Sequence, residues 1–431
     1  MSVEPERAPT AADQLHAKRW LVLILLGVAQ LMVTLDVTIV NIALPSAQQA
    51  LHFSAENRQW AVTAYALSFG SLLLLGGKLG DLFGRKWTFV AGLAGFAVAS
   101  AIGGLAQSFA ALIGARALQG AFGALLAPSA LSLLTLTFQY SRDRQKAFGI
   151  FTAIAGSGAS LGLLLGGVLT QALSWRWSLY VNLLVVVPAS IAVLRLVPDM
   201  RNPHRPKIDV AGVLTVTGGL FALVFGFANA ETHSWSAPLT TISIASSAVL
   251  LLAFVGIEIR TAEPLLPLDV IRDRARGGAY AAMALAGASV FSLFLFLTFF
   301  LQHDLRFTPL LTGVSFLPFT ASVILAATIN QTRVLPRLGA RPVVFGGSVL
   351  GLAAMLLLTR LSPQASYSAD VLPSLLLAGL GLGSVFSSAL STGTLGVKPA
   401  HAGIASAIVN MSQQVGGSVG PLSSAPSSPA L

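Results

Sequence analysis

The sequence predicts an all-α protein that crosses a membrane many times. Of its 431 residues, 55% are hydrophobic and only 10% are charged, with a mean hydropathy of +0.78; a soluble domain carries about 25% charged residues. Apolar segments recur along the chain, and most approach the roughly 20 residues that a membrane-spanning helix needs. The chain contains no cysteine, which excludes disulfides and thiolate-bound metals.

Twelve apolar segments follow one another, and a thirteenth begins near residue 402. If the N-terminus is cytoplasmic, 21 of the 26 Lys and Arg residues fall on the cytoplasmic side, as the positive-inside rule requires. The five exceptions are Arg58, Arg116, Arg176, Arg306 and Arg360. The net charge of +10 therefore reflects topology, and no nucleic-acid partner is expected. The segments are 21–45, 59–77, 88–106, 108–137, 147–173, 178–197, 211–230, 239–258, 279–302, 310–332, 342–360 and 371–396.

The first segment carries a carboxylate and a polar stripe. Asp36 lies within the stretch VTLDVTIVNIALP, where an ionisable group is costly and by default indicates a transport pathway or proton relay. Helical spacing aligns Gln30, Thr34, Thr38 and Asn41 in one stripe. Asp36 lies roughly 160° from Thr34 and Thr38 at about 100° per residue. The stripe could line a cavity or only bond within the bundle, while Asp36 faces a neighbouring helix.

Arg116 in the fourth segment lies at the same depth as Asp36. Each is roughly 12–14 Å from the external end of its segment at about 1.5 Å per residue, so the two can meet. Burial favours a protonated carboxyl, whereas an approaching Arg116 favours the carboxylate. We expect the pair to couple transport to protons, and a permanent ion pair that only fixes packing is the alternative. Gln119 and Gly120 share the face of Arg116, and Glu258, near a segment end, is expected to reach the interface.

Glycines recur every four residues in the fifth segment, at Gly158, Gly162 and Gly166, and Gly167 follows. Such a ridge of small residues lets a neighbouring backbone approach closely. Packing is its usual role, and here it could also control sliding between the two halves.

Two loops share the same spacing of glycine and basic residues. Residues 78–86 read KLGDLFGRK and residues 333–341 read RVLPRLGAR, so Gly84 aligns with Gly339. The two loops lie eight segments apart, which indicates two bundles of six helices separated by two inserted helices. The predicted organisation is a cytoplasmic N-terminal tail (1–20), an N-terminal six-helix bundle (21–197), two inserted helices (198–260) and an incomplete C-terminal bundle (261–421).

The thirteenth segment places Asn410, Gln413 and Gln414 on one face, which would suit a polar cavity wall. After Pro421 the chain enters a Ser- and Pro-rich tail, 422–431, which cannot continue a membrane-spanning helix. We therefore expect a fourteenth span to be missing, with the chain truncated or frame-shifted near Pro421.

Other chemistries have little support in the sequence. No GxxxxGK[ST] motif is present to bind ATP phosphates, and the six histidines fall in loops or at segment ends. We expect no enzyme, no catalytic residue, no metal and no cofactor, with a proton gradient as the energy source.

Together these motifs resemble the major facilitator superfamily, in particular its fourteen-span drug:proton antiporter branch. The resemblance covers about residues 20–421. The similar stretches are 35–45 (LDVTIVNIALP), 77–86 (GKLGDLFGRK), 116–120 (RALQG), 158–167 and 174–182 (SWRWSLYVN).

The resemblance implies export of small amphipathic compounds in exchange for protons, by alternating access between two bundles. It implies that Asp36 carries the proton, that Arg116 modulates it, and that Asp81 bridges the two halves near a helix N-terminus. From local spacing, Asp81 could equally cap the next helix or pair with Arg85 or Lys86. The loop motif comprises Gly77, Gly80, Asp81, Gly84, Arg85 and Lys86.

Three departures from the family pattern affect the expected activity, and one of them is the missing end near Pro421, on which activity itself depends. Leu163 follows Gly162 where the fifth-span motif usually has proline, which could alter antiport coupling. Spans nine to twelve contain no buried acid, so neutral or monovalent cationic substrates are expected.

We therefore predict a multi-pass protein of the cytoplasmic membrane that exports small molecules by proton antiport. Its partners would be the substrate, protons and the lipid bilayer. One alternative is a truncated membrane protein that does not transport, or an assembly partner. Another is an uptake symporter, which the direction of flux would distinguish.

Overall fold

The computed structural model describes residues 11–54, 57–138, 143–197, 199, 209–232, 234–261, 264–266, 270, 273–362, 364–398 and 401–419. In this part of the chain every regular element is a helix. Residues 1–10 of the predicted N-terminal tail, the region around Pro421 and the predicted tail 422–431 lie outside the described residues, while residues 11–20 belong to the first helix.

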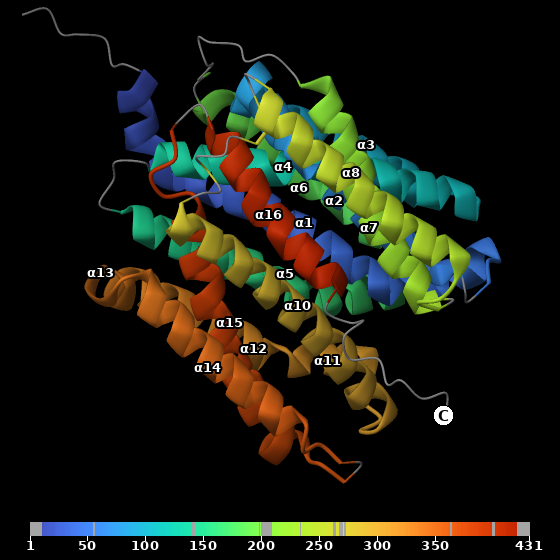
Figure 1. Ribbon diagram of the computed structural model, residues 1–431. Coiled ribbons are helices and arrows are strands. Elements are labelled where there is room, and N and C mark those ends of the chain that lie inside the picture. The colour runs from blue at the N-terminus through green and yellow to red at the C-terminus, as the bar shows by residue number, and fades with distance from the viewer. Residues whose placement is uncertain are drawn as a thin grey trace, which may run out of the picture.

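Six long helices form a first group (Figure 1). Helix α1 packs along α5 and also contacts α4 and α6, and α4 packs on both α2 and α3. The six helices are α1 (Ala11–Leu51), α2 (Arg58–Phe83), α3 (Arg85–Gly104), α4 (Phe109–Thr137), α5 (Arg144–Ala172) and α6 (Trp177–Leu196).

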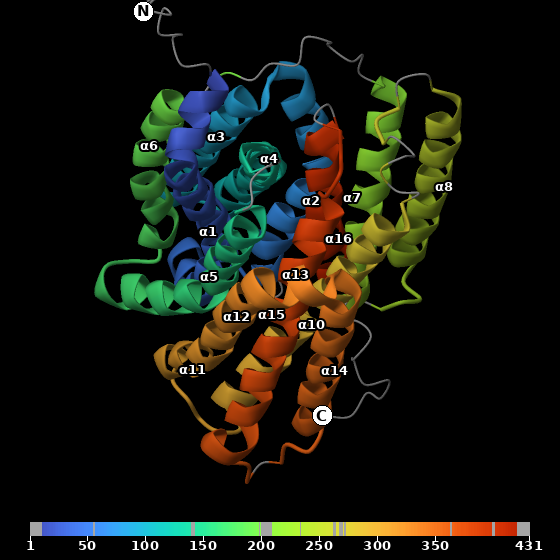
Figure 2. The same cartoon turned by 90° about the vertical axis from the view of Figure 1, so that its left-hand side faces the viewer.

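Two further helices, α7 (Val210–Thr232) and α8 (Pro238–Arg260), pack on each other, and α7 also packs on α2. Figure 2 shows them at the side of the first group. They are the helices that the repeat spacing singled out as an inserted pair.

The second group contains the remaining helices, two of which include π-helical turns. Each π-helical segment is followed two residues later by a proline, Pro336 or Pro373. Proline cannot donate to the carbonyl four residues earlier, and the wider π turn accommodates its ring. The elements are α10 (Arg274–His303), α11 (Pro309–Ser315), α12 (Leu317–Ile329), η1 (Asn330–Val334), α13 (Leu335–Leu338), α14 (Ala340–Leu358), η2 (Tyr367–Val371), α15 (Leu372–Gly393) and α16 (Ala402–Val419).

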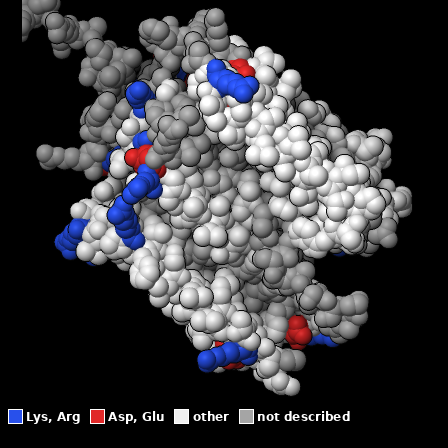
Figure 3. Space-filling view, viewed as in Figure 1, with Lys and Arg blue, Asp and Glu red and all other residues white. Residues whose placement is uncertain are grey.

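Twelve helices among the described residues are long and apolar enough to cross a membrane, and they correspond to the twelve predicted segments. Helix α16 begins where the thirteenth was expected and is not among those twelve. Figure 3 shows charged side chains near the two ends of the helices, with a broad uncharged band between them on this face. The fold class predicted from composition, all-α and membrane-spanning, is confirmed.

The two repeated loops have the same backbone form. Gly84 has φ 94° and separates α2 from α3, and Gly339 has φ 78° and separates α13 from α14. In each case the next helix begins at the following residue. Positive φ favours glycine because it lacks a Cβ, so the aligned glycines form equivalent tight junctions between helices.

The two groups meet along two lines of contact: α5 packs against α11 and α12, and α16 packs against α2 and α4 (Figure 2). At Gly77 a Cβ would lie 2.7 Å from the Gly403 carbonyl oxygen, so α2 and α16 nearly touch through their backbones. We call the end of the molecule that carries the 78–86 loop, the start of α5 and the start of α16 the basic end.

Candidate functional site

Asp36 lies in a buried polar network inside the first group of helices. Its side chain is 0% exposed. Its Oδ2 accepts a hydrogen bond from Arg116 Nη1 at 2.5 Å, and its Oδ1 accepts from Asn182 Nδ2 at 2.7 Å and Gln119 Nε2 at 3.0 Å. All three partners are hydrogen-bond donors and one of them is a guanidinium, which is the geometry of a charge-assisted carboxylate site. The structure therefore holds Asp36 as a paired carboxylate.

Arg116 is held on several sides and is also 0% exposed. Its Nε donates to the Ala61 carbonyl at 3.1 Å, and its Nη1 donates to Gln119 Oε1 at 2.8 Å as well as to Asp36. The guanidinium carbon lies 4.5 Å from the centre of the Tyr65 ring, which adds a cation–π contact. Removing Asp36 would leave this buried cation without a counter-charge, which is strongly destabilising.

Ser100 and the two amides close the network. Gln119 Nε2 and Asn182 Nδ2 both donate to Ser100 Oγ, at 2.8 and 3.2 Å, in addition to their bonds with Asp36. These residues come from α3, α4 and α6, and each is at most 1% exposed. The carboxylate of Asp36 is therefore closed off from solvent in this arrangement.

The polar stripe of α1 does not share the environment of Asp36. The Thr34 hydroxyl donates to the Gln30 carbonyl at 3.1 Å, and the Thr38 hydroxyl donates to the Leu35 carbonyl at 3.1 Å. Gln30, Thr34 and Thr38 are half-buried, and Asn41 is exposed. Both threonines use their hydroxyls within their own helix, so the stripe is mainly a packing surface here.

Glycines allow close contact between the helices that carry these residues. A Cβ at Gly158, Gly162 or Gly166 would approach an α1 atom to 3.0 Å or less, and a Cβ at Gly120 would clash with the backbone of α2. Gly167 instead faces α11 of the second group. The ridge on α5 therefore packs against the stripe on α1, the commoner role of such a ridge.

Leu163 shows the consequence of replacing the proline of the family motif. It is buried in the same apolar cluster as Phe316 and Phe319 of the second group, and α5 runs unbroken through this position. Leucine keeps its backbone N–H and does not clash with the preceding turn as proline would. Helix α5 packs along α11 and α12 in this region.

Asp81 joins the two groups at the basic end. Its Oδ1 accepts from Arg85 Nη2 at 2.6 Å and from the Gly403 backbone N–H, near the start of α16, at 3.2 Å. A carboxylate at a helix N-terminus is stabilised by the unpaired N–H groups there. Of the two local roles left open by the sequence, Asp81 makes the ion pair with Arg85, and the helix that it caps is α16 rather than the next helix, α3.

The remaining residues of this loop motif have separate contacts. Gly80 faces Ser129 of α4, and Lys86 Nζ donates to the Leu194 carbonyl of α6 at 2.9 Å, so Lys86 is not the partner of Asp81. Together with the close approach at Gly77 and the junction at Gly84, these contacts fix the ends of α2 and α3 against their neighbours.

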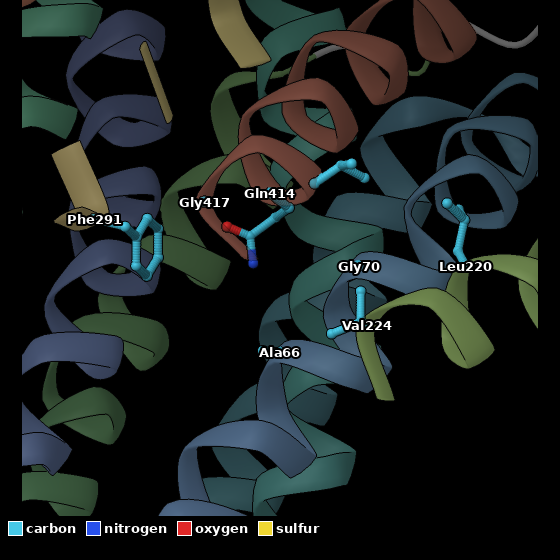
Figure 4. Close-up of a pocket in the computed structure, with 8 residues that line it drawn as sticks. Ala66, Gly70, Leu220, Val224, Phe291, Gln414 and Gly417 are labelled. Atoms are coloured by element: carbon cyan, nitrogen blue, oxygen red, sulfur yellow. The ribbon is translucent and has the colours of Figure 1, made fainter. Parts of the chain in front are cut away.

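The predicted polar face of α16 contributes one side chain to a small cavity of about 60 Å³. Gln414 is its polar wall, and Phe291 and Gly417 lie beside it (Figure 4). Asn410 instead donates to the Ser406 carbonyl of its own helix at 2.9 Å, and the Gln413 backbone lies against Gly287 of α10. The other lining residues are apolar or glycine: Ala66, Gly70, Leu220, Val224 and Val415.

Glu258, near the end of α8, was expected to reach the membrane interface. It is only 5% exposed, and its carboxylate accepts the backbone N–H groups of Leu265 at 3.1 Å and Leu266 at 2.8 Å. The chain turns back after α8, which brings these donors to the carboxylate. The expectation about the membrane interface stays a prediction, because these contacts give the burial of Glu258 within the protein and not its depth in a bilayer.

Ser100, Asn182 and Tyr65 belong to the network and were not predicted as site residues. Asn182 had a signal, because an amide in an apolar helix needs a partner and the residue closes the family-like stretch SWRWSLYVN. A serine or tyrosine within a membrane helix has no such signal, because its hydroxyl can bond to its own backbone or reach the interface.

Comparison with known proteins identifies the family of this chain. The profile described as Major Facilitator Superfamily matches residues 26–421. The Puromycin resistance protein pur8 of Streptomyces alboniger is 44% identical over 405 residues, covering 94% of this chain and 80% of that protein. The Cephamycin export protein CmcT of Amycolatopsis lactamdurans is 36% identical, covering 92% and 82%.

A third relative, the Tetracenomycin C resistance and export protein of Streptomyces glaucescens, is 36% identical, covering 96% of this chain and 76% of that protein. Among solved structures, the human organic anion transporter MFSD10 has the same fold, with a TM-score of 0.65 over 93% of this chain and 92% of that chain, at 16% identity. The chain therefore belongs to the major facilitator superfamily of membrane transporters.

Proposed function

We propose that this protein exports small amphipathic, neutral or monovalent cationic compounds across the cytoplasmic membrane in exchange for protons, as a member of the fourteen-span drug:proton antiporter branch. The observation that carries this proposal is the buried Asp36–Arg116 pair inside the first group of helices. Relatives named for puromycin resistance and cephamycin export support the substrate class and the outward direction.

Asp36 is proposed to bind and release one proton in each cycle. In the present arrangement its carboxylate is neutralised by Arg116 and has three donors. When the helices move and Arg116 withdraws, a buried carboxylate without a partner is costly, and binding a proton removes that cost. When the pair forms again, the proton is released.

The basic end is proposed to face the cytoplasm, as does the N-terminus. Support comes from the Lys and Arg residues of the 78–86 loop and from the positive-inside rule. The contact of Asp81 with α16 and the close approach of Gly77 to Gly403 then close the cytoplasmic side. The structure would accordingly be a state that is closed to the cytoplasm.

The second group supports the expected charge of the substrate. Among its described residues, no aspartate or glutamate is buried. A divalent cation would need additional negative charge near its path, whereas a neutral or monovalent compound would not.

Efflux from cells tests the proposal. Cells that express the wild type, loaded with a fluorescent lipophilic cation, should export it, and a protonophore or Asp36→Asn should stop export. Asp304→Asn, which removes an exposed carboxylate at the end of α10, is the matched control and should export normally. Undiminished protonophore-sensitive efflux by Asp36→Asn would refute the role of Asp36, and a well-expressed wild type that exports nothing would favour the non-transporting alternative.

A further inference from the structure

Arg144 is a buried arginine at the basic end that lies between the two groups of helices. It is the first residue of α5 and is 8% exposed. Its Nη2 donates to Thr394 Oγ1 at 3.1 Å and to the Ser391 carbonyl at 3.5 Å, and its Nη1 donates to the Thr135 carbonyl at 3.5 Å. Its guanidinium carbon also lies 4.4 Å from the centre of the Phe148 ring.

In the part of the chain that the structure describes, no carboxylate pairs with Arg144. Its acceptors instead belong to the C-terminal ends of two helices. Thr135 is in the last turn of α4, and Ser391 is in the last turn of α15, so each group of helices supplies one end. A helix C-terminus carries roughly half a negative charge, and two such ends together can balance one guanidinium.

Asp81 makes the complementary contact on the same connection of the second group. Its carboxylate caps the N-terminus of α16, whereas Arg144 caps the C-terminus of α15. Helices α15 and α16 are joined by residues 394–401. The first group therefore holds this connection at both ends, with a negative charge at the positive helix end and a positive charge at the negative helix end.

We propose that Arg144 is a positioning residue that acts with Asp81 to keep the basic end closed, by binding the C-terminus of α15. This inference rests on the alternating access in the proposed function. On opening, Arg144 would keep its contact with α4 and lose its contact with α15. The guanidinium would then become hydrated, which offsets part of the lost interaction and makes the contact reversible.

Distances between spin labels test the proposal directly, because the chain has no native cysteine. Cysteines at the exposed positions Phe83 and Leu338 report the basic end, since these residues precede the two equivalent junction glycines. Cysteines at Leu105 and Phe299, also exposed, report the opposite end.

Arg144→Met should raise the ratio of long to short distances at the basic end by about tenfold, the effect of losing a hydrogen bond to a charged group. The distances at the opposite end should shorten at the same time. Thr394→Val removes only the hydroxyl acceptor and should shift the basic end in the same direction by less. The double variant should exceed Arg144→Met very little, because the two changes remove one shared contact.

Lys146→Met is the matched control, because it removes an exposed charge from the same turn of α5. It should leave both distances unchanged, and Arg144→Lys should restore part of the closed population. Wild-type distances in both Arg144→Met and Thr394→Val would overturn the proposal, as would an equal shift in Lys146→Met. If Arg144→Met fails to fold, Thr394→Val alone decides. The spin labels report whether the basic end is open or closed even if no export occurs. A failure of the proposed export function can therefore be distinguished from a failure of this proposal.

Discussion

Neutralising the buried Asp36–Arg116 pair one residue at a time should destabilise the protein more than neutralising both. Asp36→Asn leaves Arg116 without a counter-charge at a position that is 0% exposed, and Arg116→Gln leaves Asp36 in the same condition. Breaking a buried ion pair in this way costs about 3–5 kcal/mol. The double variant contains no unpaired charge and has amides that can bond with Gln119 and Asn182, so we expect it to recover at least about 2 kcal/mol relative to the sum of the single losses.

The free energies of unfolding of the wild type, both single variants and the double variant, measured by denaturation in mixed micelles, give this coupling energy. Arg19 and Asp143 provide the control, because this pair is partly exposed, with side-chain exposures of 18% and 37%, and the same cycle there should give at most about 1 kcal/mol. A coupling below about 1 kcal/mol at Asp36–Arg116 would refute the reasoning, since it falls within the range of an exposed pair. On the proposal that Asp36 carries the proton, the double variant should still fail in proton-driven export even where its stability is restored.

Three further predictions concern single residues. Asn182→Leu removes one donor from Asp36 Oδ1 and should slow proton-driven efflux by about tenfold, with little change in the amount of folded protein in detergent. Gly77→Val should push α16 away from α2, because even a Cβ would lie 2.7 Å from the Gly403 carbonyl, and spin labels at the basic end should report longer distances. Gly339→Ala should lower the free energy of unfolding by about 1–3 kcal/mol through backbone strain alone, whereas Gly346→Ala, equally unobstructed but within a helix, should raise it by about 0.5–1 kcal/mol.

The positions of the membrane-crossing helices were predictable because length and apolarity alone decide whether a helix spans a bilayer. The contact between Asp36 and Arg116 was also predictable from the sequence, because a constant rise per residue places both residues at the same depth. The aligned glycines Gly84 and Gly339 indicated equivalent junctions for a local reason, since both require a backbone conformation that favours glycine.

The partners of these residues were harder to predict because they depend on how each helix is rotated about its axis. Ser100 and Asn182 come from helices that the sequence does not place relative to Asp36. The charge of Arg144 was attributed to topology, because many basic residues lie at the predicted cytoplasmic ends of segments. The sequence therefore did not indicate that Arg144 is buried between the two groups of helices. The partners of Glu258 were hidden for the same reason, because its donors lie in a loop whose path the sequence does not give.

Transport in proteoliposomes tests the role of Asp36 most directly. Wild-type protein should move a fluorescent lipophilic cation against its gradient when a pH gradient is imposed, with protons moving in the opposite direction. Asp36→Asn, reconstituted in equal amount and orientation, should produce neither the uphill movement nor the linked proton flux. Uphill transport by Asp36→Asn at the wild-type rate would contradict the assignment of Asp36 as the proton carrier, and co-directional movement of protons and substrate in the wild type would contradict antiport.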